Sequence, residues 1–188
     1  MKTNYIILDL EATCWDININ NKPLETIEIG AIKYDSGYSK VSEFNCFVKP
    51  IMEPLLSQFC KNLTSINQHD IDNAKKFSEA VFEFQKWIDT SEEYLLCSWG
   101  FYDKKQLLFD CNLHEINTNW LFNHISLKHQ YAKLKNLIRP IEMEAALKLE
   151  NIFLDGVHHR GIDDARNIAK IFLKFKEAWQ LDTDPYSL

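Results

Sequence analysis

The sequence lacks several features that mark other broad classes of protein. It has no run of about eighteen apolar residues, the length that a membrane-spanning helix needs, and its N-terminus lacks the charged-then-apolar layout of a secretory signal. Its five cysteines are odd in number and form no Cys-x-x-Cys pair, which argues against a disulfide framework and against zinc as the working ion. We therefore expect a soluble, cytoplasmic protein with reduced thiols and no membrane partner.

The sequence motifs of three common enzyme classes are also missing. The chain has no Gly-x-x-x-x-Gly-Lys-Ser/Thr loop, no Gly-x-Ser-x-Gly elbow and no Gly-x-Gly-x-x-Gly turn, so nucleoside triphosphatases, serine hydrolases and dinucleotide-binding enzymes are poorly supported. No repeat, low-complexity segment or Pro/Gly/Ser-rich linker divides it. Because 188 residues with 46% hydrophobic content can bury one substantial core, we predict a single domain over residues 1–188.

A basic tail or arm is missing as well, and the formal net charge is −6. Affinity for nucleic-acid phosphates usually comes from a basic face, so this balance disfavours a long binding track. Bound divalent cations can compensate by neutralising site carboxylates. If the ligand is a nucleic acid, we expect a short footprint at a chain end, helped by Lys104, Lys105 and Arg160.

What the chain does contain is carboxylates in three short, well-placed segments. Asp9 and Glu11 follow a continuous apolar run, Asp103 follows a second one, and Asp164 comes five residues after His159. Residues two apart on a strand point to the same face, so Asp9 and Glu11 could bind the same metal cluster. Carboxylate oxygens are the ligands that Mg²⁺ and Mn²⁺ prefer, and a histidine can take up a proton near neutral pH.

Each of these residues, considered alone, has a simpler structural interpretation. Asp9 and Glu11 could be solvated acids at the end of a strand, and Asp103 could cap the helix that follows it. Asp163 and Asp164 could complement the dipole of the last helix, which is the role we assign to Asp163. His158 and His159 could be ordinary loop histidines. Only the order and spacing of the segments together favour catalysis.

Four motifs resemble, in the same order, those of the DEDDh-type 3'→5' exonucleases, and most of all the Eri1-like and histone-mRNA exonucleases. They are the Asp-x-Glu-Ala-Thr-Cys segment at 9–14, Glu-Ile-Gly at 28–30, Phe-Cys-x-x-Leu-Thr-x-Ile-x-Gln at 59–68, and His-x-Gly-x-Asp-Asp-Ala-x-Asn-Ile-Ala at 159–169. The resemblance runs from Asp9 to the helix after Asp164 and includes Trp-Gly-Phe-Tyr-Asp at 99–103.

The resemblance implies a role for each site residue. Two divalent cations, Mg²⁺ or Mn²⁺, would be held by carboxylates, with His159 as the general base for the attacking water. The metal ligands would be Asp9, Glu11, Asp103 and Asp164. Ala12 and Thr13 would hold the terminal nucleotide, and Phe59, Leu63 and Tyr102 would wedge or stack its base. Phe59 and Leu63 have an alternative, because their spacing also suits the core face of a helix.

The expected activity is metal-dependent hydrolysis of single-stranded nucleic acid from its 3' end, with RNA preferred and nucleoside 5'-monophosphates released. The partner would then be the 3' end of single-stranded RNA, or of DNA. Two alternatives are a DNA-directed 3'→5' exonuclease and a non-catalytic nucleic-acid-binding or regulatory protein on the same fold. All five catalytic groups are present in the sequence, which favours an enzyme.

Hydrophobic periodicity predicts an α/β fold. We expect strands at 5–10, 26–34, 41–48, 94–99 and, more weakly, 123–127, and helices at 77–88, from 103 through 108, at 142–149 and at 162–179. The resemblance makes this a ribonuclease H-like fold, with a mixed β-sheet of about five strands flanked by helices on both faces.

Overall fold

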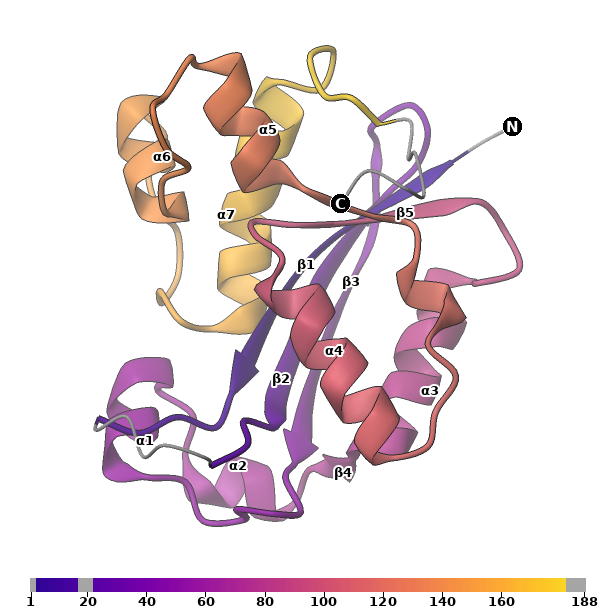
Figure 1. The fold of residues 1–188 in the computed structure, drawn as a ribbon, viewed down its shortest axis with the longest axis vertical. Coiled ribbons are helices and arrows are strands. Elements are labelled where there is room, and N and C mark those ends of the chain that lie inside the picture. Colours follow the sequence, from indigo (N-terminus) through magenta and orange to yellow (C-terminus); the bar gives the residue numbers. More distant parts are fainter. Residues whose placement is uncertain (1–2, 17–21, 182–188) are drawn as a thin grey trace.

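A mixed six-stranded sheet forms the centre of the computed structural model, which describes residues 3–16 and 22–181 (Figure 1). The strand order is β4-β3-β2-β1-β5-β6. The strands are β1 (Asn4–Ala12), β2 (Thr26–Tyr34), β3 (Lys40–Lys49), β4 (Lys75–Lys76), β5 (Tyr94–Ser98) and β6 (His124–Ser126). β1, β2 and β3 pair antiparallel, whereas β5 runs parallel to β1, β6 to β5 and β4 to β3.

Helices cover both faces of the sheet. The helices are α1 (Gln58–Thr64), α2 (Gln68–Asp72), α3 (Phe77–Ile88), α4 (Tyr102–Leu113), the 3₁₀ helix η1 (Asn119–Leu121), α5 (Leu127–Leu134), α6 (Met143–Leu149) and α7 (Gly161–Lys174). Figure 1 shows α5, α6 and α7 together on one side, α3 and α4 on the other, and α1 and α2 near the ends of β1 and β2. Among the described residues, no helix is long and apolar enough to cross a bilayer.

Strand β1 is buried between two hydrophobic cores because its side chains alternate between the faces of the sheet. Ile7 packs in the core that α7 covers, whereas Ile6 and Leu8 pack in the core beneath α3 and α4. Asp9 and Glu11 have the same parity as Ile7 and therefore project toward α7. The central strand thus delivers two carboxylates to the α7 side of the sheet.

The predicted α/β fold is confirmed, with corrections at its edges. The sheet has six strands rather than about five, because β4 adds a two-residue pair to β3. Helix α7 ends at Lys174 and not at Trp179, since the chain turns there and the Trp179 ring folds back to stack on Phe172, with its Nε1 donating to the Phe172 carbonyl at 2.8 Å. The strand predicted at 123–127 is β6 at His124–Ser126. Leu127 instead begins α5, a helix that the sequence pattern did not predict.

Candidate active site

Three carboxylates meet where β1 passes the first turn of α7. Asp9 and Glu11 come from β1, and Asp164 comes from α7. One ligand atom from each lies within 4.8 Å of the others. The side chains of Glu11 and Asp164 are buried and that of Asp9 is partly buried. This is the geometry of a site for a hard cation, with oxygen ligands from two elements far apart in sequence.

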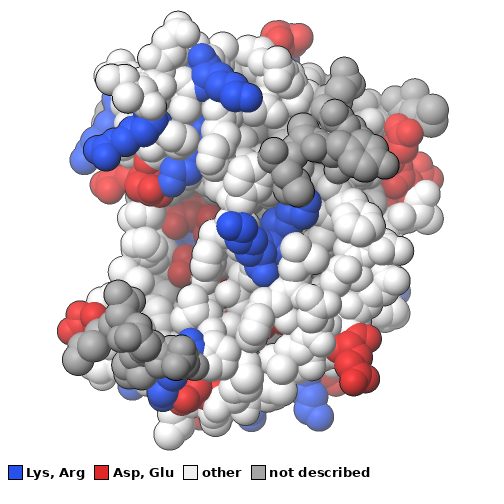
Figure 2. All heavy atoms as spheres, viewed as in Figure 1, with Lys and Arg blue, Asp and Glu red and all other residues white. Residues whose placement is uncertain are grey.

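The fourth carboxylate, Asp103, reaches the same place from α4, which follows β5. Its Oδ1 accepts a hydrogen bond from the Leu10 backbone N–H at 3.1 Å, so the side chain is fixed beside β1, and it is buried. Asp9, Glu11, Asp103, Asp164 and His159 all line one cavity of about 570 Å³. Figure 2 shows acidic side chains recessed in a hollow, with basic side chains on the surface beside it.

The proximity of these carboxylates shifts their protonation. Burial, followed by repulsion from Asp103 and Glu11, raises the pKa of Asp9 well above its usual range. Burial and the charges of Asp164 and Glu28 raise the pKa of Glu11 to about 9. Burial raises the pKa of Asp103 to about 6, although the N–H of Leu10 and the Ser98 hydroxyl oppose the shift. The site is therefore too rich in negative charge to be fully ionised without cations.

Two neighbouring histidines stand beside Asp164. The Nδ1 atom of His158 lies 3.0 Å from Oδ2 of Asp164, and the backbone N–H of His159 donates to the same oxygen at 2.9 Å. The His159 backbone has a left-handed φ of 64°, and the two rings stack with centroids 4.0 Å apart. Burial, and then the charge of His158, lowers the pKa of His159. His159 is thereby held neutral on the cavity wall, in the form that accepts a proton.

A glycine pair brings α7 into contact with the sheet. A Cβ added at Gly30 of β2 would lie only 2.1 Å from the Gly161 carbonyl carbon, and one at Gly161 would lie 3.1 Å from the Asp9 carbonyl oxygen. Any side chain at these positions would push the helix away. The Glu-Ile-Gly and His-x-Gly motifs are therefore two sides of one contact that sets the distance between Asp9 and Asp164.

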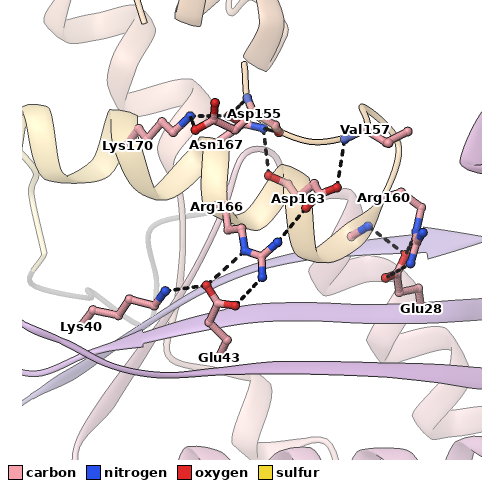
Figure 3. A network of polar contacts seen from close by, with 11 residues as sticks. Glu28, Lys40, Glu43, Asp155, Val157, Arg160, Asp163, Arg166, Asn167 and Lys170 are labelled. Atoms are coloured by element: carbon pink, nitrogen blue, oxygen red, sulfur yellow. Dashed lines mark hydrogen bonds and ion pairs between the residues drawn. The ribbon is translucent and has the colours of Figure 1, made fainter. Parts of the chain in front are cut away.

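A buried ion pair fixes the loop that precedes α7 (Figure 3). Glu28 of β2 is fully buried, and its carboxylate accepts hydrogen bonds from Arg160 Nε at 3.0 Å, from Arg160 Nη2 at 3.2 Å and from the Gly161 N–H at 3.0 Å. The Arg160 guanidinium also lies over the Phe47 ring. The Arg160 guanidinium thus pairs with Glu28 and packs on Phe47, and these contacts do not support the prediction that Arg160 helps to bind substrate.

Ion pairs hold the exposed side of α7 against β3. Arg166 forms ion pairs with Glu43 of β3 at 2.6 Å and with Asp163 at 2.8 Å, as Figure 3 shows. Asp163 also accepts the backbone N–H of Val157 at 2.9 Å. Asp163 lies in the first turn of α7 but does not line the cavity, so the structure separates it from Asp164.

The predicted substrate residues are only partly gathered at the cavity. Tyr102, the first residue of α4, lines it and is 48% exposed. Ala12 and Thr13 are buried at the end of β1, and the Thr13 hydroxyl accepts the Glu25 N–H at 3.0 Å. Phe59 and Leu63 lie on α1, whose buried side chains are Cys60 and Thr64, while Phe59 is 37% exposed. The alternative that Phe59 and Leu63 form the core face of a helix is therefore wrong.

Four cavity-lining residues were not predicted from the sequence: Lys128, Glu142, Met143 and Glu144. His158, for which the sequence suggested an ordinary loop position, lines the cavity as well. Lys128 and the 142–144 segment belong to no motif and come from α5 and from around the start of α6. The one available signal was that His158 adjoins His159. No local pattern shows that α5 and α6 face the same hollow as β1.

Comparison with known proteins identifies the family. The sequence profile of the family described as exonuclease (RNase T) matches residues 6–172. The chain belongs to this exonuclease family. Among curated exonuclease relatives, it is 30% identical to ERI1 exoribonuclease 2 of Xenopus laevis over 88% of this chain, and 27% identical to the human 3'-5' exoribonuclease 1 over 89%. The chain spans about a quarter of the length of the first relative and half of the second.

Solved exonuclease structures share the fold. The nuclease domain of 3'hExo, described as a DEDDh family member bound to rAMP, superposes with a TM-score of 0.88 at 25% identity and covers 96% of this chain and 94% of that one. A 3'-exonuclease structure described as showing 3'-end-specific recognition of the histone mRNA stem-loop gives a TM-score of 0.87, covering 93% of this chain and 81% of that one. The predicted ribonuclease H-like, DEDDh-type architecture is confirmed.

Proposed function

We propose that this chain is a metal-dependent 3'→5' exonuclease that hydrolyses single-stranded nucleic acid from the 3' end and releases nucleoside 5'-monophosphates. The observation that carries the proposal is the convergence of Asp9, Glu11, Asp103, His159 and Asp164 on one cavity from three separate parts of the chain. A binding protein has no chemical need for that set. Exonuclease family membership supports the same conclusion.

The carboxylates fit a pair of divalent cations. Their oxygens are hard ligands, and like charges buried together are unfavourable unless cations or protons neutralise them. The raised pKa values of Asp9 and Glu11 express that cost. We propose Mg²⁺ or Mn²⁺ as the ions, held by Asp9, Glu11, Asp103 and Asp164. When bound, two such ions supply an activated water and positive charge for the scissile phosphate and the leaving 3' oxygen.

A histidine side chain provides the general base. His159 accepts the proton of the attacking water, and the lowered pKa of its ring, caused first by burial, keeps it neutral at pH 7. The hydrogen bond from its backbone N–H to Asp164 fixes the loop that carries the ring. We assign the general-base role to His159 rather than to His158, because His159 begins the His-x-Gly-x-Asp-Asp motif, five residues before Asp164.

The proposed substrate contacts are made mainly by side chains that are partly exposed. Phe59 and Tyr102 present partly exposed rings, which suits stacking on the terminal bases, and Leu63 lies on the same helix as Phe59. The side chains of Ala12 and Thr13 are buried, so their proposed contact to the terminal nucleotide would come from the backbone at the end of β1, next to Glu11. Stacking tolerates any base, so we expect little sequence preference.

RNA is the proposed substrate class. The curated relatives are named exoribonucleases, and one similar structure is described as recognising an RNA 3' end. The partner of the site would then be the 3' end of single-stranded RNA, with DNA as the weaker alternative. The single domain over 1–188 and the cytoplasmic location remain predictions from the sequence.

Digestion of matched single-stranded RNA and DNA oligomers, labelled at the 5' end, tests the proposal. With Mg²⁺ or Mn²⁺ we expect a ladder shortening from the 3' end, faster on RNA, and no cleavage in EDTA. Asp9→Ala and Asp164→Asn should abolish it, whereas Asp163→Asn, a neighbouring acid outside the cavity, should retain it. His159→Ala should lower the rate by roughly 10²–10⁴. A folded wild-type protein that cuts neither polymer with any metal would leave only the non-catalytic alternative.

A further inference from the structure

A positively charged side chain stands on the wall of the active-site cavity. Among the described residues that line it, Lys128 is the only lysine or arginine. It shares the cavity wall with six carboxylates: Asp9, Glu11, Asp103, Glu142, Glu144 and Asp164. A polyanionic strand that enters this hollow meets strong repulsion from the wall except at the metal site and at Lys128. The position of that ammonium group therefore matters for binding.

Lys128 is anchored close to the catalytic strand ends. Its backbone N–H donates to the Trp99 carbonyl at 2.6 Å, which joins the start of α5 to the end of β5. A Cβ added at Gly100 would lie 3.9 Å from Lys128 Cδ, so the aliphatic stem passes over this glycine. The side chain is only 20% exposed. The segment that carries Asp103 thus also supports the Lys128 stem.

The partner of the Lys128 ammonium is weakly held. Lys128 Nζ lies 2.5 Å from Oε1 of Glu142, whose side chain is 81% exposed and stands just before α6. Ion pairs with one freely solvated member contribute about 0–1 kcal/mol, so an incoming anion can displace Glu142 at little cost. Glu142 can then swing into solvent while Lys128 stays in place.

We propose that Lys128 binds a phosphate of the substrate strand through a non-bridging oxygen, and that Glu142 is its resting partner, displaced when the strand enters. This binding role rests on the proposed exonuclease function. The competing cations predicted from the sequence are less suited: Arg160 is committed to Glu28, and Lys104 and Lys105 do not line the cavity. A lysine serves here as a point charge for phosphate.

Steady-state kinetics on a 5'-labelled RNA oligomer test the assignment. Lys128→Met should raise KM roughly tenfold, the loss expected for one charge-assisted hydrogen bond, with kcat little changed. Lys128→Arg should largely restore KM. Glu142→Gln should lower KM by up to about fivefold, because it removes the competitor. Lys133→Met, in the same helix but lining a different hollow, is the matched control and should behave like wild type.

Salt dependence separates phosphate binding from a structural role. Each phosphate contact to a single strand adds about 0.7 to the slope of log affinity against log salt, so Lys128→Met should reduce the slope of kcat/KM by about that amount. The proposal would be overturned if wild type cuts RNA and Lys128→Met keeps the wild-type KM and salt slope, or loses kcat alone. The exonuclease proposal would then still stand. If wild type cuts nothing, the exonuclease proposal fails, and the same slope measured by anisotropy of the labelled oligomer still decides whether Lys128 binds phosphate.

Discussion

Replacing Gly30 by alanine should displace the start of α7 and, with it, part of the active site. The new Cβ would lie 2.1 Å from both the Gly161 carbonyl carbon and the Ile162 nitrogen, whereas ordinary contact begins at 3.4 Å. The obstructing atoms are backbone and cannot rotate away. The first turn of α7 must therefore retreat from β2 by about 1 Å or more, carrying Asp164 and His159 away from Asp9.

The size of the effect follows from that displacement. Overpacking a well-filled interior costs about 1–3 kcal/mol, and a clash with two backbone atoms belongs at the upper end, so we expect a loss of about 3 kcal/mol. For a chain of this size that lowers Tm by roughly 6–12 °C. A shift of about 1 Å in catalytic geometry can cost roughly 100-fold in rate, so the variant should cleave about 100-fold more slowly than wild type even where it is fully folded.

Thermal unfolding and the oligomer digestion rate, measured below the midpoint of unfolding, provide the assay. Gly37→Ala is the matched control, because a Cβ there would meet only the Asp35 side chain at 3.3 Å in an exposed turn. It should stay within about 0.5 kcal/mol of wild type. If Gly30→Ala unfolds at the wild-type temperature and keeps the wild-type rate, the glycine contact does not set the position of α7.

Three further predictions concern charge. Arg160→Met leaves the Glu28 carboxylate buried with one remaining donor, so it should destabilise the fold by about 3 kcal/mol in urea unfolding; a loss below 1 kcal/mol would contradict this. Glu11 has a folded pKa of about 9 against 4.5 unfolded, so between these values the folded state holds a proton that the unfolded chain releases, and the metal-free protein loses stability as pH rises. Glu11→Gln, which needs no such proton, should therefore raise stability by about 0.5–2 kcal/mol at pH 8 in EDTA. Hydrogen bonds from Arg166 lower the pKa of Glu43 to about 2, so this pair stabilises the fold above pH 4.5 and stabilises it less as pH falls toward 2. In Arg166→Met, acid unfolding followed by circular dichroism should no longer show this loss of stability between pH 4.5 and 2.

Local sequence pattern predicted the elements that pack through one continuous apolar face. Helix 77–88 and strand 26–34 were predicted with the bounds that the structure has. The burial of the helix follows the helical period, and the strand is buried along nearly its whole length. The pattern failed where packing is not local. The face of α1 carrying Phe59 and Leu63 has core-like spacing, yet Cys60 and Thr64 are the residues buried.

The sequence by itself determined the site chemistry: four carboxylates and a histidine in motif order, with Asp9 and Glu11 on one strand face because a strand repeats every two residues. The tertiary structure alone decided what surrounds that chemistry. Two contacts form only when β5 and α7 pack beside β1 and bring distant segments of the chain together. They are the contact of Gly30 with Gly161 and the ion pair of Lys128 with Glu142. Such contacts depend on the three-dimensional path of the whole chain, which no local spacing encodes.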